Sequence, residues 1–248
     1  MDMLKDKRVV ITGAGRSLGA ALAVVLADEG ANVILLGRTP ATLETTANTI
    51  FSRTGRKPLT FHTDMADLAS VEHAAKSILE QTEVDILINN AAFWLAGKID
   101  DVSEPDIFQT VNSMLTGTIL LTKRLLPSLL KSDSDIVNIV SVSGLPNVPL
   151  YGASSTFLAA KHGQAGFTDG LRQELKGTRV RVIGIYPPLI EDSSPLDETW
   201  NETRGKEKSI SNRDVAETIM FALTRSRNCT LSTIVLDADA GGLHSPDW

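Results

Sequence analysis

A glycine-rich turn at residues 12–19, "TGAGRSLG", is the first stretch of this sequence whose residue types and spacing suggest chemistry. It follows a run of Val and Ile and leads directly into a segment rich in Ala, Leu and Val. A glycine turn alone often only joins a strand to a helix. Here, strand, turn and helix start occur together, and the free N–H groups of a helix start favour phosphate. We therefore expect Gly13, Gly15 and Gly19 to cradle a dinucleotide pyrophosphate.

The next strand candidate, "ANVILLG", ends where a dinucleotide site distinguishes NAD from NADP. An acidic residue at that tip would bind the ribose 2′-hydroxyl and repel a 2′-phosphate. Gly37 and Arg38 stand there instead, and Arg16 lies inside the glycine turn. Two guanidinium groups suit a phosphate, so this pattern favours NADP(H) over NAD(H). The alternative is that both arginines are solvated surface charges.

The elements that must position these residues alternate along the whole chain. The strand candidates are "RVVITG", "ANVILLG", "PLTFHTD", "VDILINNA", "DIVNIVSV", "RVRVIGIYP" and "STIVLDA", with helical patterns between them. Near-continuous apolar strands indicate a sheet covered on both faces. The alternation predicts a single α/β domain over residues 1–248, a Rossmann-like, doubly wound, seven-stranded parallel sheet flanked by helices.

The composition favours small-molecule chemistry. The 248 residues are 42% apolar and 22% charged, and the formal net charge is −6. Nucleic acid and anionic membranes need a basic surface, so neither is expected as a partner. Cys229 is the single cysteine, the four histidines lack metal-ligand spacing, and no segment reaches the ~18 apolar residues of a membrane span. We expect no metal and, without a signal-peptide pattern, a cytoplasmic location.

Two further motifs follow the glycine turn in order: Asp64 in "HTDM" and the strand end "LINNAA". With "TGAGRSLG", they resemble the adenine-side aspartate, the N-N-A-G motif and the T-G-x-x-x-G-x-G turn of the short-chain dehydrogenase/reductase family, over essentially the whole chain. Ser17, Ala92 and Pro188 replace glycines of that family, which lowers the expected cofactor affinity. The predicted cofactor residues are Gly13, Gly15, Arg16, Ser17, Leu18, Gly19, Arg38, Asp64, Met65, Asn90, Ala91, Lys161, Pro187 and Leu189.

The same resemblance implies a catalytic group. Asn112 in "QTVNSM" matches the family's active-site asparagine, Ser141 in "NIVSVSG" its serine, and Lys161 the lysine of its Y-x-x-x-K motif. In the family, the tyrosine hydroxyl exchanges a proton with the substrate oxygen while hydride moves to or from the nicotinamide. The lysine holds the nicotinamide ribose, the serine orients the substrate carbonyl, and the asparagine helps to hold the lysine through water.

Phe157 stands at the tyrosine position of this pattern. A phenyl ring has no exchangeable proton, and loss of a positioned acid typically lowers a rate by about 10²–10⁴. Tyr151 is a candidate substitute, but it lies ten residues before Lys161. On a helix that separation is about 15 Å and a different face, so only a loop could bring Tyr151 back. His162 points about 100° away from Lys161 and is expected at a surface or an interface.

Three functions fit these residues. The first is an NADP(H)-dependent oxidoreductase acting on a carbonyl or alcohol, with Ser141 and Lys161 in place and the proton supplied by water, Tyr151 or the substrate. The second, which Phe157 supports, is a catalytically impaired NADP(H)-binding sensor or partner protein. The third is reduction of an imine or activated alkene, which needs no tyrosine acid. An engineered change at position 157 also fits the pattern.

The segment 189–211 is a long polar connection after the sixth strand, and we expect it to form a substrate lid. Residues that suggest a partly aromatic pocket, or ordinary packing, are Phe93, Trp94, Leu145, Tyr151, Leu189 and Trp200. Apolar helix segments such as "TILLTKRLLPSLL", together with the family resemblance, imply a homodimer or homotetramer that acts on a small-molecule substrate.

Overall fold

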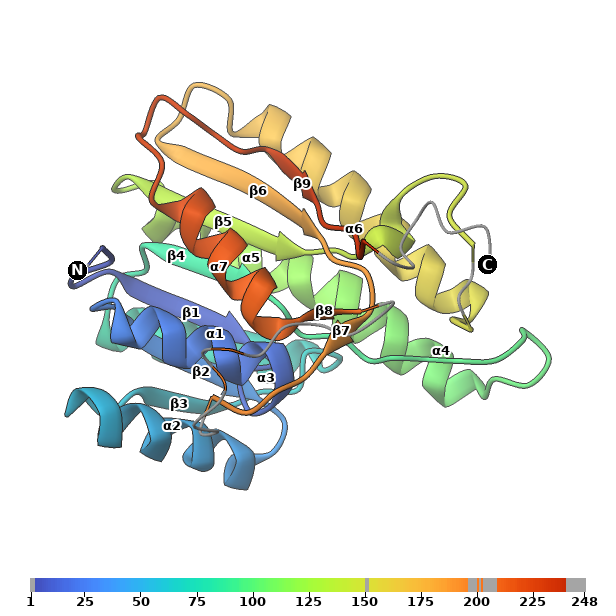
Figure 1. Ribbon diagram of the computed structural model, residues 1–248, viewed down its shortest axis with the longest axis horizontal. Coiled ribbons are helices and arrows are strands. Elements are labelled where there is room, and N and C mark those ends of the chain that lie inside the picture. Colours follow the sequence, from blue (N-terminus) through green and yellow to red (C-terminus); the bar gives the residue numbers. More distant parts are fainter. Residues whose placement is uncertain (1–2, 150–151, 196–199, 201, 203–208, 240–248) are drawn as a thin grey trace.

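The computed structural model describes residues 3–149, 152–195, 200, 202 and 209–239 (Figure 1). In this part of the chain, parallel strands form a seven-stranded sheet in the order β3-β2-β1-β4-β5-β6-β9. The strands are β1 (Arg8–Thr12), β2 (Asn32–Gly37), β3 (Leu59–His62), β4 (Ile86–Asn89), β5 (Ser134–Ile139), β6 (Val180–Tyr186) and β9 (Thr233–Val235). The predicted fold, a single doubly wound domain with a seven-stranded parallel sheet, is confirmed.

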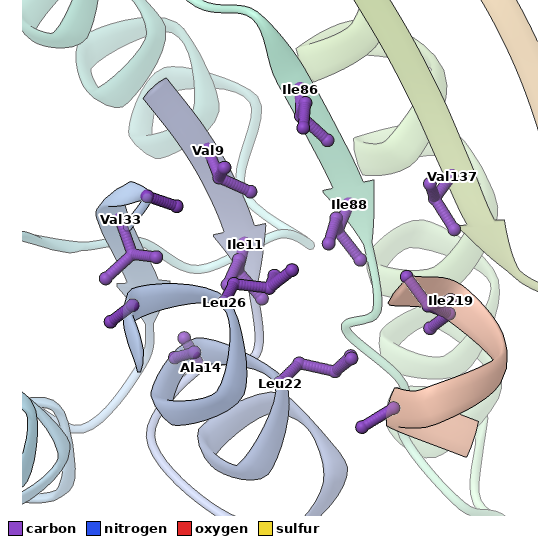
Figure 2. Close-up of a cluster of buried hydrophobic side chains, with 14 of the residues drawn as sticks. Val9, Ile11, Ala14, Leu22, Leu26, Val33, Ile86, Ile88, Val137 and Ile219 are labelled. Atoms are coloured by element: carbon purple, nitrogen blue, oxygen red, sulfur yellow. The ribbon is translucent and has the colours of Figure 1, made fainter. Parts of the chain in front are cut away.

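Helices cover both faces of the sheet and enclose two separate apolar cores. One core lies under α1 (Ser17–Asp28), α2 (Pro40–Thr54) and α7 (Asn212–Leu223), and the other under α3 (Leu68–Gln81), α5 (Gly117–Leu129) and α6 (Ser155–Glu174). Successive strand residues point to opposite faces, so Val9 and Ile11 enter the first core, shown in Figure 2, and Val10 enters the second. This arrangement explains why the strands are apolar at almost every position.

Serine caps define where the last two long helices begin. The Ser154 hydroxyl accepts from the N–H of Phe157 at the start of α6. Ser211 and Asp214 form a reciprocal capping box at the start of α7. Each cap stabilises its helix by about 1 kcal/mol. The Ser154 cap also determines the helical phase of α6, and hence which face of the helix carries Phe157 and Lys161.

The helix after β4 changes its winding midway. Helix α4 (Glu104–Val111) continues through a π-helical segment, η1 (Asn112–Thr116), into α5. Such segments appear mostly as insertions in α-helices, frequently at functional sites. An insertion of this kind shifts the residues that follow it around the helix axis. In this protein Met114, in the middle of η1, packs against Phe157 and Ala160 of α6.

Two short strands, β7 (Ile190–Glu191) and β8 (Ile210–Ser211), pair in parallel outside the main sheet. The sequence pattern did not predict this pair. It joins the two ends of the predicted lid at 189–211, of which residues 196–199, 201 and 203–208 lie outside the described part. Over the described ranges, no helix has the length and apolarity to cross a bilayer, and no three His, Cys, Asp or Glu side chains cluster as metal ligands do.

Candidate active site

A cleft of about 790 Å³ opens at the carboxyl ends of the parallel strands. The cleft lies at β1, which has β2 as its neighbour on one side and β4 on the other, so that the strand order reverses there. Such reversal points are the usual ligand sites of open α/β sheets. Every residue predicted to contact the cofactor lines this cleft, from the glycine turn to Lys161, Pro187 and Leu189. The structure therefore brings the predicted cofactor residues together.

The glycine turn packs too closely against its protein neighbours to accept side chains. A Cβ atom on Gly19 would collide with the Gly13 carbonyl oxygen and would lie 2.7 Å from Asn90 Nδ2. Arg16 is the N-cap residue of α1, and no described side chain caps this helix start. The first N–H groups of α1 thus remain available to an anion. Ser17 adopts a φ of 51°, the left-handed conformation that the family's glycine would adopt more easily.

The two predicted phosphate-binding arginines lie at the rim of the cleft. Arg16 and Arg38 are both exposed and both line it. The Arg38 guanidinium lies 5.8 Å from the centre of the Phe93 ring, a cation–π contact that holds it over the cleft wall. Sequence reasoning missed Thr39 and Thr42, two hydroxyl residues at the same rim. Their position just after the strand tip was the available signal.

Lys161 lines the same cleft and is buried, with 3% of its surface exposed. Its Nζ donates to the carbonyl oxygen of Ile139 at 3.0 Å and to Oε1 of Gln164 at 2.8 Å. Burial lowers the pKa of Lys161 to about 7, because the ammonium group loses its hydration. An ammonium group has three donors, so one N–H remains for a ligand in the cleft.

Phe157 forms an apolar wall where the family has its tyrosine. Its ring is buried, and its centre lies 5.9 Å from Lys161 Nζ. The Trp94 ring contacts it edge to face, with 4.8 Å between the ring centres. Met114, Ala153 and Ala160 pack around it. This wall therefore offers a ligand aromatic surface and no proton.

Ser141 follows β5 and starts the short helix η2 (Val142–Gly144) with an unusual backbone. Its φ of 130° and ψ of 155° fall in a region that is essentially restricted to glycine. Its Oγ accepts from the N–H of Ser143 at 3.1 Å, and both serines line the cleft. A serine in this conformation costs on the order of 1–3 kcal/mol, a cost that typically persists at functional sites. The structure thus places Ser141 on the cleft lining, and its catalytic role stays a prediction.

The site position predicted for Asn112 requires a correction. Its Oδ1 accepts from the Thr116 hydroxyl at 3.2 Å on the exposed side of the helix, and Asn112 is not among the described residues that line the cleft. Residues two positions apart on a helix face in different directions. Because Met114 is the residue that packs against α6, Asn112 is turned away from Lys161. The family role predicted for Asn112 does not match this position.

Gln164 makes the connection that the sequence analysis assigned to Asn112. Its Nε2 donates to the Met114 carbonyl oxygen at 2.7 Å, while its Oε1 accepts from Lys161. Gln164 was not among the residues predicted for the site. The signal was a polar residue three positions after Lys161, because residues that are three apart share a helical face.

The predicted aromatic pocket is formed in part. Phe93, Trp94 and Leu189 line the cleft, and the side chains of Trp94 and Leu189 are exposed at its mouth. Leu145 is outside the described lining. Trp200 is buried, and its Nε1 donates to Asn212 Oδ1 at 3.3 Å, which indicates a packing role.

The structure describes only one of the two residues considered as a replacement acid. Tyr151 lies outside the described residues, so its role stays a prediction. His162 is exposed on α6, and its Nδ1 lies 3.0 Å from the Leu158 carbonyl oxygen. This position is the surface location that the helical geometry predicts for it.

Comparison with known proteins identifies the family of this chain. The family model described as short chain dehydrogenase matches residues 7–205. The chain belongs to the short-chain dehydrogenase/reductase family, a family of oxidoreductases.

Similar proteins match nearly the whole chain. An uncharacterized oxidoreductase of Staphylococcus aureus (strain MRSA252) is 31% identical over 239 residues, covering 95% of this chain and 99% of that protein. An NADP-dependent 3-hydroxy acid dehydrogenase of Schizosaccharomyces pombe is 29% identical over 257 residues, covering 98% and 96%. The solved structure of a Shigella flexneri short chain dehydrogenase complexed with NADP has a TM-score of 0.81 and 26% identity, covering 94% of this chain and 98% of that one.

Proposed function

We propose that this protein is an NADP(H)-dependent oxidoreductase that transfers hydride between the cofactor and a carbonyl or alcohol group of a small molecule. One observation carries the proposal: a single cleft joins the glycine turn, both arginines, Ser141 and Lys161. The NADP complex of the Shigella relative and the name of the Schizosaccharomyces relative support the choice of cofactor.

The residues of the cleft divide between binding and chemistry. The glycine turn and the uncapped start of α1 bind the pyrophosphate, and Arg16 and Arg38 bind the 2′-phosphate. The remaining N–H of Lys161 binds the ribose hydroxyls. The hydroxyl of Ser141 donates to the substrate oxygen. The cofactor, when bound, supplies the hydride chemistry.

The proton does not come from residue 157. Lys161 has a pKa of about 7, so near neutrality its ammonium form can release a proton and its amine form can take one. We propose that the proton of this remaining N–H passes between Lys161 and the substrate oxygen through cleft water, and that the same N–H binds the ribose hydroxyls when no proton is being transferred. Tyr151 is the alternative donor. The Phe157–Trp94 wall also favours a second candidate function, a protein that binds NADP(H) without efficient turnover.

Cofactor binding and turnover separate these candidates. NADPH and NADH are titrated against tryptophan fluorescence, for which Trp94 is a reporter because it lines the cleft. Trp94→Phe is the control, and it should remove most of the quenching. Absorbance at the nicotinamide band then follows turnover with ketones, quinones, imines and enones. Tight NADPH binding with steady oxidation is expected. NADPH binding without turnover on any of these substrates would favour the sensor function.

A further inference from the structure

Three structural elements meet at the side chain of Lys161. Its Nζ donates to the Ile139 carbonyl oxygen at the end of β5 and to Gln164 on its own helix, α6. Gln164 in turn donates to the Met114 carbonyl oxygen in η1. A continuous hydrogen-bonded chain thus connects the sheet, α6 and the π-helical segment.

The Gln164 side chain is 1% exposed. A buried amide is costly unless its polar atoms are paired, and here the carbonyl accepts from Lys161 while the NH₂ group donates to Met114. An apolar side chain could fill the same space without this requirement. The amide is therefore better explained by the lysine that it holds than by packing.

We propose that Gln164 is a positioning residue for this site: it holds Lys161 against the end of β5 and directs the remaining N–H of Lys161 to the ligand in the cleft. The proposal rests on the proposed function, because that N–H acts on the cofactor and on the proton path only in an oxidoreductase. It assigns to Gln164 a direct connection from Lys161 to the π-helical segment, with no water needed between them.

The hydrogen-bond partners of Lys161 Nζ in the described part of the chain are both uncharged. No residue of η1 or η2 has an ionisable side chain. The ionisable side chains on the cleft lining, on α4, β5 and β6 and elsewhere on α6 are Arg16, Arg38, Asp64, Glu104, Asp106, Asp135, His162, Asp169, Arg172, Glu174, Arg181, Tyr186 and Asp192. The lowered pKa of Lys161 comes from burial. Residue 164 is thus a position from which one introduced charge would act strongly on the amine.

The test introduces two substitutions with opposite expected effects. Gln164→Glu places a carboxylate next to Nζ and should raise the pKa of Lys161 by about 1–3 units, because an opposite charge favours the ammonium form. Gln164→Leu removes a hydrogen-bond acceptor of the ammonium group and should lower that pKa. Gln173→Glu, the same substitution at an exposed position of α6, is the matched control and should leave the pKa of Lys161 unchanged.

Two readouts follow the titration. In the free protein, the pKa is measured from the ¹³C shift of the lysine ε-carbon, assigned with Lys161→Met. In parallel, NADPH affinity is measured from pH 6 to pH 10. The pH at which affinity falls should move up with Gln164→Glu and down with Gln164→Leu, and at pH 8 the leucine variant should bind about tenfold more weakly, a difference of about 1.4 kcal/mol.

The outcomes distinguish the role of Gln164 from the proposed function. If all variants keep the wild-type pKa and NADPH affinity, Gln164 has no positioning role although the oxidoreductase function stands. If the pKa of Lys161 follows residue 164 but NADPH does not bind, the positioning of Lys161 stands and the proposed function fails. A merely structural glutamine would lower the melting temperature without moving the titration in opposite directions. Should Gln164→Leu not fold, Gln164→Glu, which keeps the side-chain shape, decides alone.

Discussion

The Nζ atom of Lys161 lies 5.9 Å from the centre of the Phe157 ring. The two residues are one turn apart on α6, so the amine and the phenyl ring share a helical face and one wall of the cleft. This pairing brings a titratable group next to an aromatic ring that has no proton to exchange.

Phe157→Tyr should raise the activity toward ketones. The new hydroxyl would belong to a ring that already lines the cleft next to Lys161, and a positioned acid is worth about 10²–10⁴ in rate. Steady-state NADPH oxidation with a ketone panel measures the effect. Phe221→Tyr makes the same change at an exposed position and should leave the rate unaltered. An unchanged rate for Phe157→Tyr would show that the proton already comes efficiently from another group.

The buried Lys161 should make stability increase with pH. Its pKa is about 7 in the folded protein and about 10.4 in an unfolded chain, so between these values the unfolded state binds more protons. Stability should therefore be lowest below pH 7 and rise toward pH 10, by on the order of 4 kcal/mol at about 1.4 kcal/mol per unit.

Lys161→Met removes this dependence and provides the measurement. Urea unfolding at pH 6 and pH 9.5 should show that the wild type gains stability relative to Lys161→Met as the pH rises. Lys176→Met, at an exposed lysine of the same region, should behave as the wild type does. Parallel pH profiles for wild type and Lys161→Met would mean that Lys161 does not titrate in this range.

Substitutions of Ser141, whose backbone is strained, should change stability and activity in different ways. Ser141→Gly relieves the backbone strain at φ 130°. Glycine also makes the unfolded chain more flexible, which offsets part of this gain, so the net stabilisation of the protein should be about 1 kcal/mol. Ser141→Ala keeps the strain and should change stability little. Both should lose most turnover. Thermal melts of these two variants test the strain. Ser143→Gly is the control: Ser143 has no left-handed backbone, so this substitution should lower stability. Equal melting temperatures for Ser141→Gly and Ser141→Ala would contradict the strain.

Arg38→Asp should reverse the cofactor preference. It removes one guanidinium and adds a carboxylate that repels a 2′-phosphate, so NADPH should bind roughly 10–100-fold more weakly, as expected for a lost charge-assisted contact. NADH affinity should stay the same or rise. Lys5→Asp makes the same charge change near the start of β1, away from the described cleft lining. If both variants weaken NADPH equally, Arg38 acts only through net charge.

The sheet and the cofactor end of the cleft were predictable because local pattern determines them. The run from Val9 to Ile11 is apolar at every position since its side chains enter two cores, and this pattern is visible without any tertiary contact. Likewise, Gly13 and Gly19 belong to one short motif that is visible in the sequence, although the atoms that exclude their side chains include the Asn90 side chain just after β4.

The catalytic end depends on contacts between distant segments. Asn112 was assigned from a motif, but Met114, two residues later in the π-helical segment, is the residue that packs against α6. Lys161 donates to the carbonyl oxygen of Ile139, which lies on a different element, and no spacing rule predicts that contact. Gln164 had a local signal, its spacing from Lys161, but its second partner on η1 is again a tertiary one.

The pairing of β7 with β8 holds the two ends of the 189–211 segment next to each other. A loop whose ends are already joined can change length cheaply, since doubling its length costs only about 0.6 kcal/mol of closure entropy. This segment can therefore change in length and sequence without disturbing the parallel sheet. If it forms the substrate lid that the sequence predicts, new substrate ranges would arise by exchange of this one segment while the nucleotide half is inherited intact.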